Sequence, residues 1–156
     1  LAAELVAAFD LNNPLAVEYA ERQAAELVRK INETTREELR AIIAKGTEEG
    51  WSYSKLARVM RRKFDEFSTT RAHLIAVTEL GNAYSHGTLT AARQVQDEGI
   101  DLEKSWLTVG DGRESDECLA NARAGWIPLN DIFPGGVERP LQHPRCRCSL
   151  LTRRAA

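Results

Sequence analysis

The chain has 156 residues, of which 43% are hydrophobic and 28% are charged, and its formal net charge is -2. The length suits one compact domain, or a small domain with a helical extension, and the composition is that of a globular protein. The charge balance excludes a global basic field that would attract nucleic acid. No apolar run approaches the roughly 20 residues that cross a bilayer, so we expect no membrane partner. The sequence begins at Leu1 without a visible signal peptide, so we expect an upstream part to be absent and folding to occur in a reducing cytoplasm.

Residues 1–31 have the apolar spacing of helices. An apolar segment covers residues 1–9 and stops before Pro14. Proline is well suited to the first turn of a helix, and apolar residues then recur every three or four positions from Leu15 to Ile31. The pattern predicts one amphipathic helix over residues 15–31.

Two further helices are expected before residue 66. Thr35 and Glu38 resemble a capping box, which predicts a helix that starts there and ends near residues 46–50. Ser52 or Ser54 would cap a short helix that follows. Its end is locally basic, which is typical of a solvated face, with a nucleic-acid contact as the alternative. The basic residues are Arg58, Arg61, Arg62 and Lys63.

The longest periodic segment begins after Ser68 and predicts one helix over residues 69–96, which Gly99 would end. A polar line runs along this helix. Such a line is typical of a solvated or hydrogen-bonded face, and a catalytic acid/base pair is the alternative. Its members are Arg71, Glu79, Asn82 and His86.

After Gly99 the pattern changes to short extended segments, at residues 104–109, 126–129 and 146–151, with a short helix over residues 114–124. A sheet this small needs a helix to pack against, and the helix over 69–96 is the candidate. The predicted fold class is therefore α+β: N-terminal helices plus one long helix packed on a small antiparallel sheet with long loops, closed by a His/Cys cluster.

All three cysteines lie in this last part, and a histidine accompanies them. Cys118, His143, Cys146 and Cys148 form a complete set of four ligands for a structural zinc ion. Cys146 and Cys148 would point to one face of an extended strand. Two alternatives remain open. The cysteines could be reduced, buried thiols, or two of them could form a disulfide, although the odd number argues against a disulfide framework.

The loop before Cys118 contains further charged residues. Asp111, Arg113 and Asp116 could tie the loop down through charge-assisted hydrogen bonds, or they could form a solvated turn.

An ordered set of residues across 67–152 resembles the phage Mu F-like head morphogenesis proteins, which are minor head proteins of tailed bacteriophages and prophages. The chain departs from the family pattern at Val77, where an arginine is common, and at Cys118, where many members have histidine. A soft metal site tolerates such a His/Cys exchange. The residues that carry the resemblance are Arg71, Glu79, Ala83, Gly87, Lys104, Trp106, Thr108, Asp111, Arg113, Cys118, Gly125, Pro128, Phe133, Pro140, His143, Cys146 and Cys148.

The resemblance implies a structural and interaction role in head assembly near the portal. The expected partners are the phage portal or other head proteins, with a weak DNA contact. The expected location is the virion head, and the host cytoplasm during assembly. Residues 1–66 would be a helical, partner-binding arm, and residues 67–156 the Mu F-like head morphogenesis domain. We expect no enzymatic activity and one structural Zn.

Two other functions are compatible with the residues. A metal-dependent hydrolase or nuclease, or a toxin-associated module, could use His143 with Asp111 and Asp116. It would need an open position on the metal, and four His/Cys ligands leave none. A DNA-binding module could instead use the basic residues at 58–63 together with Arg145 and Arg147.

Overall fold

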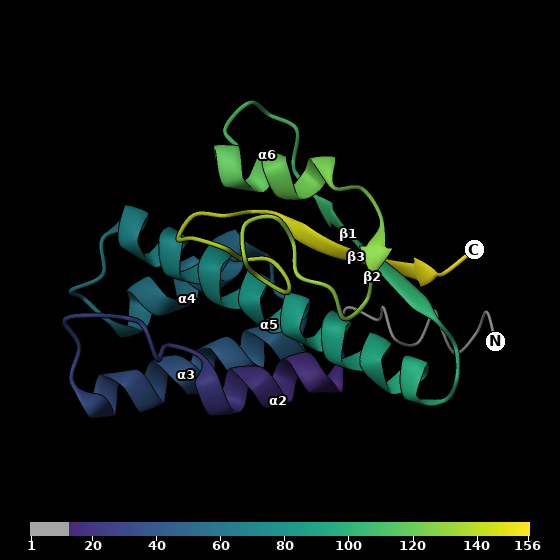
Figure 1. Ribbon diagram of the computed structural model, residues 1–156. Helices are drawn as coiled ribbons and strands as arrows, with labels where there is room; N and C mark the ends of the chain where they lie inside the picture. The colour runs from purple at the N-terminus through teal and green to yellow at the C-terminus, as the bar shows by residue number, and fades with distance from the viewer. Residues whose placement is uncertain (1–12) are drawn as a thin grey trace.

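The computed structural model describes residues 13–156. The elements are α2 (Pro14–Gln23), α3 (Glu33–Glu48), α4 (Tyr53–Lys63), α5 (Thr69–Asp97), β1 (Leu102–Leu107), α6 (Asp116–Arg123), β2 (Ile127–Pro128) and β3 (Ser149–Arg154), as labelled in Figure 1. This order confirms the α+β class. The apolar segment expected at residues 1–9 lies outside the described residues.

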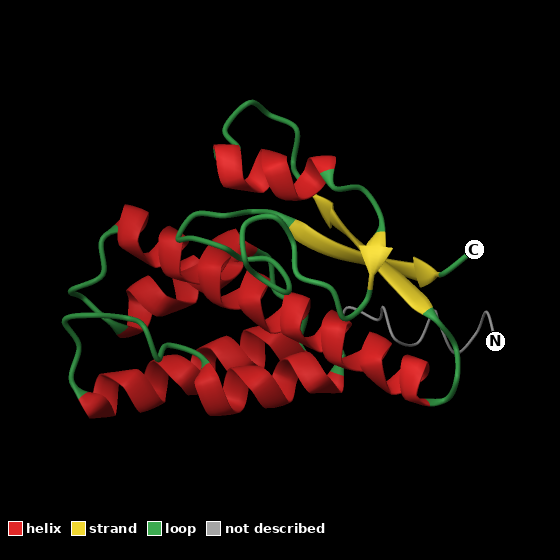
Figure 2. Cartoon of the chain, viewed as in Figure 1, coloured by secondary structure: helices red, strands yellow, loops and turns green. Residues whose placement is uncertain are grey.

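The long helix α5 separates two parts of the molecule. Helices α2, α3 and α4 all pack against it (Figure 2). One apolar core fills the space between them. Leu39, Ile43, Leu56 and Met60 are completely buried in this core. The apolar stripes of α3 and α4 therefore face α5.

A three-stranded antiparallel sheet, in the order β2-β1-β3, lies on the other side of α5. β3 contacts α5, and α6 contacts β1. A second apolar core joins the sheet to the C-terminal half of α5. It contains Leu89, Trp106, Phe133 and Leu150, as well as the three cysteines.

The start of α5 agrees with the sequence prediction because its cap is a local signal. The Ser68 hydroxyl accepts a hydrogen bond from the Arg71 amide at 3.1 Å, and the helix runs to Asp97. Ser52 caps α4 in the same way, by accepting from the Lys55 amide at 3.2 Å. A serine oxygen satisfies one of the first amides, which have no partner inside the helix.

Three other predicted boundaries were wrong. The helix expected over residues 15–31 ends at Gln23, and the following turn includes Ala25 with a φ of 63°. The cap of α3 is Asn32 and not Thr35, because the Asn32 side chain accepts from the Thr35 amide at 2.8 Å. The last strand begins at Ser149, so the cysteines lie in the loop before it.

The predicted boundary between residues 66 and 67 falls in the loop that joins α4 to α5. The helices on both sides of that boundary share one apolar core. None of the helices in residues 13–156 is both long enough and apolar enough to cross a membrane.

Candidate metal centre

Cys118 is placed by the first turn of α6. The Ser115 hydroxyl caps this helix by accepting a hydrogen bond from the Cys118 amide at 3.2 Å. The preceding turn is folded back by Glu114, whose carboxylate accepts from the amides of Gly110 and Asp111. A local cap and a local turn thus direct the Cys118 thiol inward, where it is 1% exposed.

His143 and Cys146 are held by one tight turn. The Cys146 amide donates to the His143 carbonyl at 3.1 Å, and Arg145 between them has a φ of 69°. His143 Nδ1 lies 2.8 Å from the Pro144 carbonyl oxygen, which can only accept, so we assign the proton to Nδ1. In this tautomer the Nε2 lone pair can accept from the Ser115 hydroxyl at 3.1 Å or the Cys118 thiol at 3.3 Å. A metal-binding histidine is commonly oriented by such a carbonyl.

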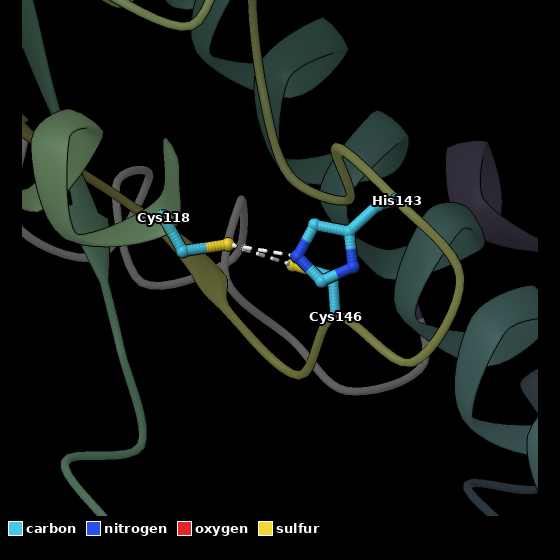
Figure 3. Close-up of side chains that lie close together, drawn as sticks. All are labelled: Cys118, His143 and Cys146. Atoms are coloured by element: carbon cyan, nitrogen blue, oxygen red, sulfur yellow. Dashed lines mark hydrogen bonds between the residues drawn. The ribbon is translucent and has the colours of Figure 1, made fainter. Parts of the chain in front are cut away.

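The three side chains converge on one point, as Figure 3 shows. Cys118 Sγ lies 3.3 Å from His143 Nε2 and 3.6 Å from Cys146 Sγ. All three ligand atoms lie within 4.8 Å of one another. Tetrahedral zinc with bonds of about 2.3 Å to sulfur and about 2.0 Å to nitrogen separates its ligands by about 3.6 Å. The spacing of the donors therefore fits one tetrahedral ion.

Cys148 lies beside this group but is not one of its three convergent members. It is 7% exposed, and its thiol shares a hydrogen bond with Cys146 that raises the pKa of Cys148 and lowers the pKa of Cys146. The role of Cys148 as the fourth ligand stays a prediction.

The thiols are poorly solvated and depend on one another for stabilisation. Burial raises the pKa of Cys118, so its thiolate is disfavoured without a cation. None of the three cysteines is in a disulfide, so each could become a thiolate ligand of a metal. A divalent ion would replace the thiol protons and remove the cost of burying thiolates.

A charged pair joins the two loops that carry the donors. Both Asp111 carboxylate oxygens accept from the Arg147 guanidinium at 2.8 Å, and this bond lowers the pKa of Asp111. Asp111 therefore ties the loop down, as one sequence hypothesis proposed. Asp116 is exposed in the first turn of α6, and neither carboxylate belongs to the His/Cys group.

The polar line on α5 makes structural contacts, and three of its members, Arg71, Glu79 and Asn82, also line the groove described below. Arg71 donates to the Arg29 carbonyl, Glu79 accepts from the Ala25 amide at 3.1 Å, and His86 stacks on Tyr19. Burial raises the pKa of Glu79. These side chains hold the loop over residues 24–30 and helix α2 against α5.

A groove of about 570 Å³ lies between that loop, α5 and residues 141–144. Leu74, Ile75 and Leu141 give it an apolar lining, and Leu27 stands at its edge with 86% of its surface exposed. It is also lined by three basic residues, Arg29, Lys30 and Arg71, and by the acidic residue Glu79.

Sequence reasoning missed two buried polar residues that shape the loops. Lys104 is completely buried in β1 and donates to the Glu138 carbonyl at 2.8 Å, while burial lowers the pKa of Lys104 to about 8. Asn121 donates to Gln142 and accepts from the Gly135 amide, both at 2.7 Å. Lys104 could have been found from its alternation with Leu102 and Trp106, which places all three on one face of the strand.

Comparison with known proteins identifies the family. The model of the phage Mu protein F like protein family matches residues 37–151. No curated protein and no solved structure matches the chain. The matched region runs from α3 into β3 and includes all four predicted ligands, and it covers most of the chain. The chain therefore belongs to the phage Mu protein F-like family, whose members are associated with the phage head.

Proposed function

We propose that this protein is a minor head protein of a tailed bacteriophage or prophage, with a structural and interaction role near the portal during head assembly. The observation that carries the proposal is the family match over residues 37–151. Its partners are the portal protein or other head proteins, and it resides in the virion head after assembly in the host cytoplasm. This function needs no catalytic centre.

The His/Cys group supports an architectural role. Cys118, His143 and Cys146 supply three soft donors, and Cys148 would complete a closed, four-ligand zinc site. Bound zinc would join the start of α6 to the loop before β3, segments that are about 25 residues apart in the sequence. A hydrolytic metal would need an open position and nearby carboxylates, and Asp111 is already paired with Arg147.

The groove beside Leu27 is the surface that we assign to the head partner. A leucine with 86% of its surface exposed at the edge of an apolar groove is available to be buried in an interface. The basic residues around it suit a partner segment that combines apolar anchors with acidic residues.

Binding of the full chain to the portal protein of the same phage tests this function. Leu27→Glu should weaken binding by about tenfold or more, because it puts a charge into the buried part of the interface. Ile132→Glu is the matched control, since Ile132 is also exposed, at 60%, but does not line the groove. Absence of binding by the unmodified protein would contradict the portal role, and equal binding by all three proteins would exclude the groove.

A further inference from the structure

A second concave surface lies at the start of α5, beside the loops that carry the His/Cys donors. It has a volume of about 680 Å³, within the range of about 300–1,000 Å³ that is typical of ligand sites. Three segments that are distant in the sequence form it: the first turns of α5, the loop before α6 and the loop before β3. The lining residues are Thr69, Thr70, His73, Leu74, Val77, Arg113, Arg145 and Arg147.

The charge of this pocket differs from that of the whole chain. Three of its eight lining residues are arginines and none is acidic, whereas the formal net charge of the protein is -2. Among residues 13–156, the guanidinium groups of Arg113 and Arg145 form neither a hydrogen bond nor an ion pair within the protein. Two arginines with free donors therefore face one pocket, and Arg147 is fixed beside them by Asp111.

Neutral donors lie in the same pocket. Thr69 and Thr70 are the first two residues of α5, and the first amides of a helix have no acceptor inside it. The Ser68 cap accepts from the Arg71 amide, which is further along the helix. The 29-residue helix also carries partial positive charge at this end. Threonine hydroxyls, free amides and guanidinium groups are the donors that phosphate oxygens use in proteins.

We propose that this pocket binds a phosphate group, which the backbone of a nucleic acid or inorganic phosphate would supply. Guanidinium forks from Arg113 and Arg145 would pair with its oxygens, and the start of α5 would donate from the other side. Within the part of the chain that the structure describes, the pocket has no Phe, Tyr or Trp on which bases would stack, and His73 is the one ring among its lining residues. The contact with a nucleic acid would therefore be to its backbone and would not depend on sequence.

The His/Cys group would support this pocket without touching the phosphate. Arg145 and Arg147 alternate with Cys146 and Cys148, and Cys118 holds the helix that follows Arg113. An interaction that holds Cys146 and Cys148 in place therefore also restricts the positions of Arg145 and Arg147. The phosphate site itself is argued from the arginines and α5, and it does not depend on the portal role.

Binding to the full chain at low salt tests the proposal with three probes: inorganic phosphate, a short DNA duplex of mixed sequence, and a polyglutamate peptide. The variant is Arg113→Gln with Arg145→Gln. The matched control is Arg58→Gln with Arg62→Gln, which removes two exposed arginines from α4, a surface that the sequence also offered for DNA. If the first double variant does not fold, Arg113→Gln alone replaces it, because Arg113 is exposed in a turn.

We expect the unmodified protein to bind phosphate, the duplex or both, and the Arg113/Arg145 variant to bind about tenfold more weakly or worse. The α4 control should stay within about twofold of the unmodified protein. Binding of phosphate alone identifies free phosphate as the source, and binding of the duplex identifies nucleic acid. Three results would overturn the proposal: binding of neither phosphate nor duplex, an equal loss in both double variants, or polyglutamate binding as tight as that of the duplex.

Discussion

Lys104 is the residue whose charge is hardest to accommodate. Its side chain is completely buried, and its ammonium group lies 5.2 Å from the Phe133 ring and donates to the Glu138 carbonyl. Burial disfavours the charged form and lowers the pKa of Lys104 from 10.5 to about 8. The residue fastens the loop after β2 to the sheet, and its charge should oppose folding at neutral pH.

A pH series on Lys104→Met tests this interpretation. Between pH 8 and 10.5 the unfolded chain holds a proton on Lys104 that the folded chain has released, so the free energy of unfolding should rise with pH. We expect the unmodified protein to gain up to about 1.4 kcal/mol per pH unit in that window relative to the variant. Denaturant unfolding at each pH measures the difference in the free energy of unfolding between the two proteins. The contributions of the other titrating groups are the same in both proteins and cancel in this difference. A difference that does not change from pH 7 to 10.5 would show that Lys104 is not desolvated.

Cys146 lies 3.6 Å from the Cys118 sulfur and shares a hydrogen bond with Cys148. Cys146→Ser should lower the free energy of unfolding whether the thiols are only buried or bind zinc, by about 1–3 kcal/mol from the buried hydroxyl alone. The two hypotheses separate when a chelator is added. If zinc is bound, the chelator destabilises the unmodified protein and leaves Cys146→Ser unchanged. A chelator response of equal size in both proteins would show that it acts elsewhere.

At the scale of elements, α5 organises the fold through its glycines as well as its apolar residues. Gly87 is buried where α2 crosses, and a Cβ there would lie 2.9 Å from both the backbone nitrogen and the Cβ of Ala16. Gly81 faces the Leu141 side chain at 3.0 Å. A side chain can move, whereas the backbone of a packed helix cannot move without shifting the whole element.

The two glycines therefore make a matched pair of substitutions. Gly87→Ala should destabilise the protein by about 1–3 kcal/mol, because overpacking against α2 exceeds the gain in helix propensity. Gly81→Ala should be neutral, or should stabilise by up to about 1 kcal/mol, because Leu141 can adjust. Thermal unfolding of both variants measures this difference. Equal effects at the two positions would show that α2 does not approach α5 as closely as described.

The sequence predicted elements well where their boundaries depend on local signals. Ser68 and the long apolar stripe placed α5 almost correctly, since capping and periodicity operate within a few residues. The helix expected to reach Ile31 stops at Gln23 because the Ala25 amide is bound by Glu79, which is 54 residues away. No local pattern contains that contact.

Local sequence patterns also failed to predict the tertiary contacts of the candidate site. The four donor residues were identified from their types and spacing, but Cys146 and Cys148 were expected on a strand. They lie in the loop before β3, where Cys146 meets Cys118 from α6 at 3.6 Å. The ion pair between Asp111 and Arg147, which joins these loops, is also a tertiary contact. From the sequence alone, Asp111 could equally have been part of a solvated turn.

At the scale of the whole molecule, two apolar cores share α5, and the smaller one includes the thiols. The sheet has only three strands, one of which is two residues long. Such a sheet gains stability from a helix and from any ion that joins its loops. We therefore propose that an ion bound by the His/Cys group stabilises the sheet and its loops. These loops contribute residues to the groove and to the arginine pocket.

Metal content measured together with unfolding tests this account most directly. The protein is purified without added metal, analysed for its elements, and melted with and without a strong chelator. We expect about one zinc ion per chain, and a lower melting temperature once the chelator has removed it. Folded protein that contains no zinc, and whose melting temperature the chelator leaves unchanged, would contradict the central claim that a metal ion joins Cys118, His143 and Cys146.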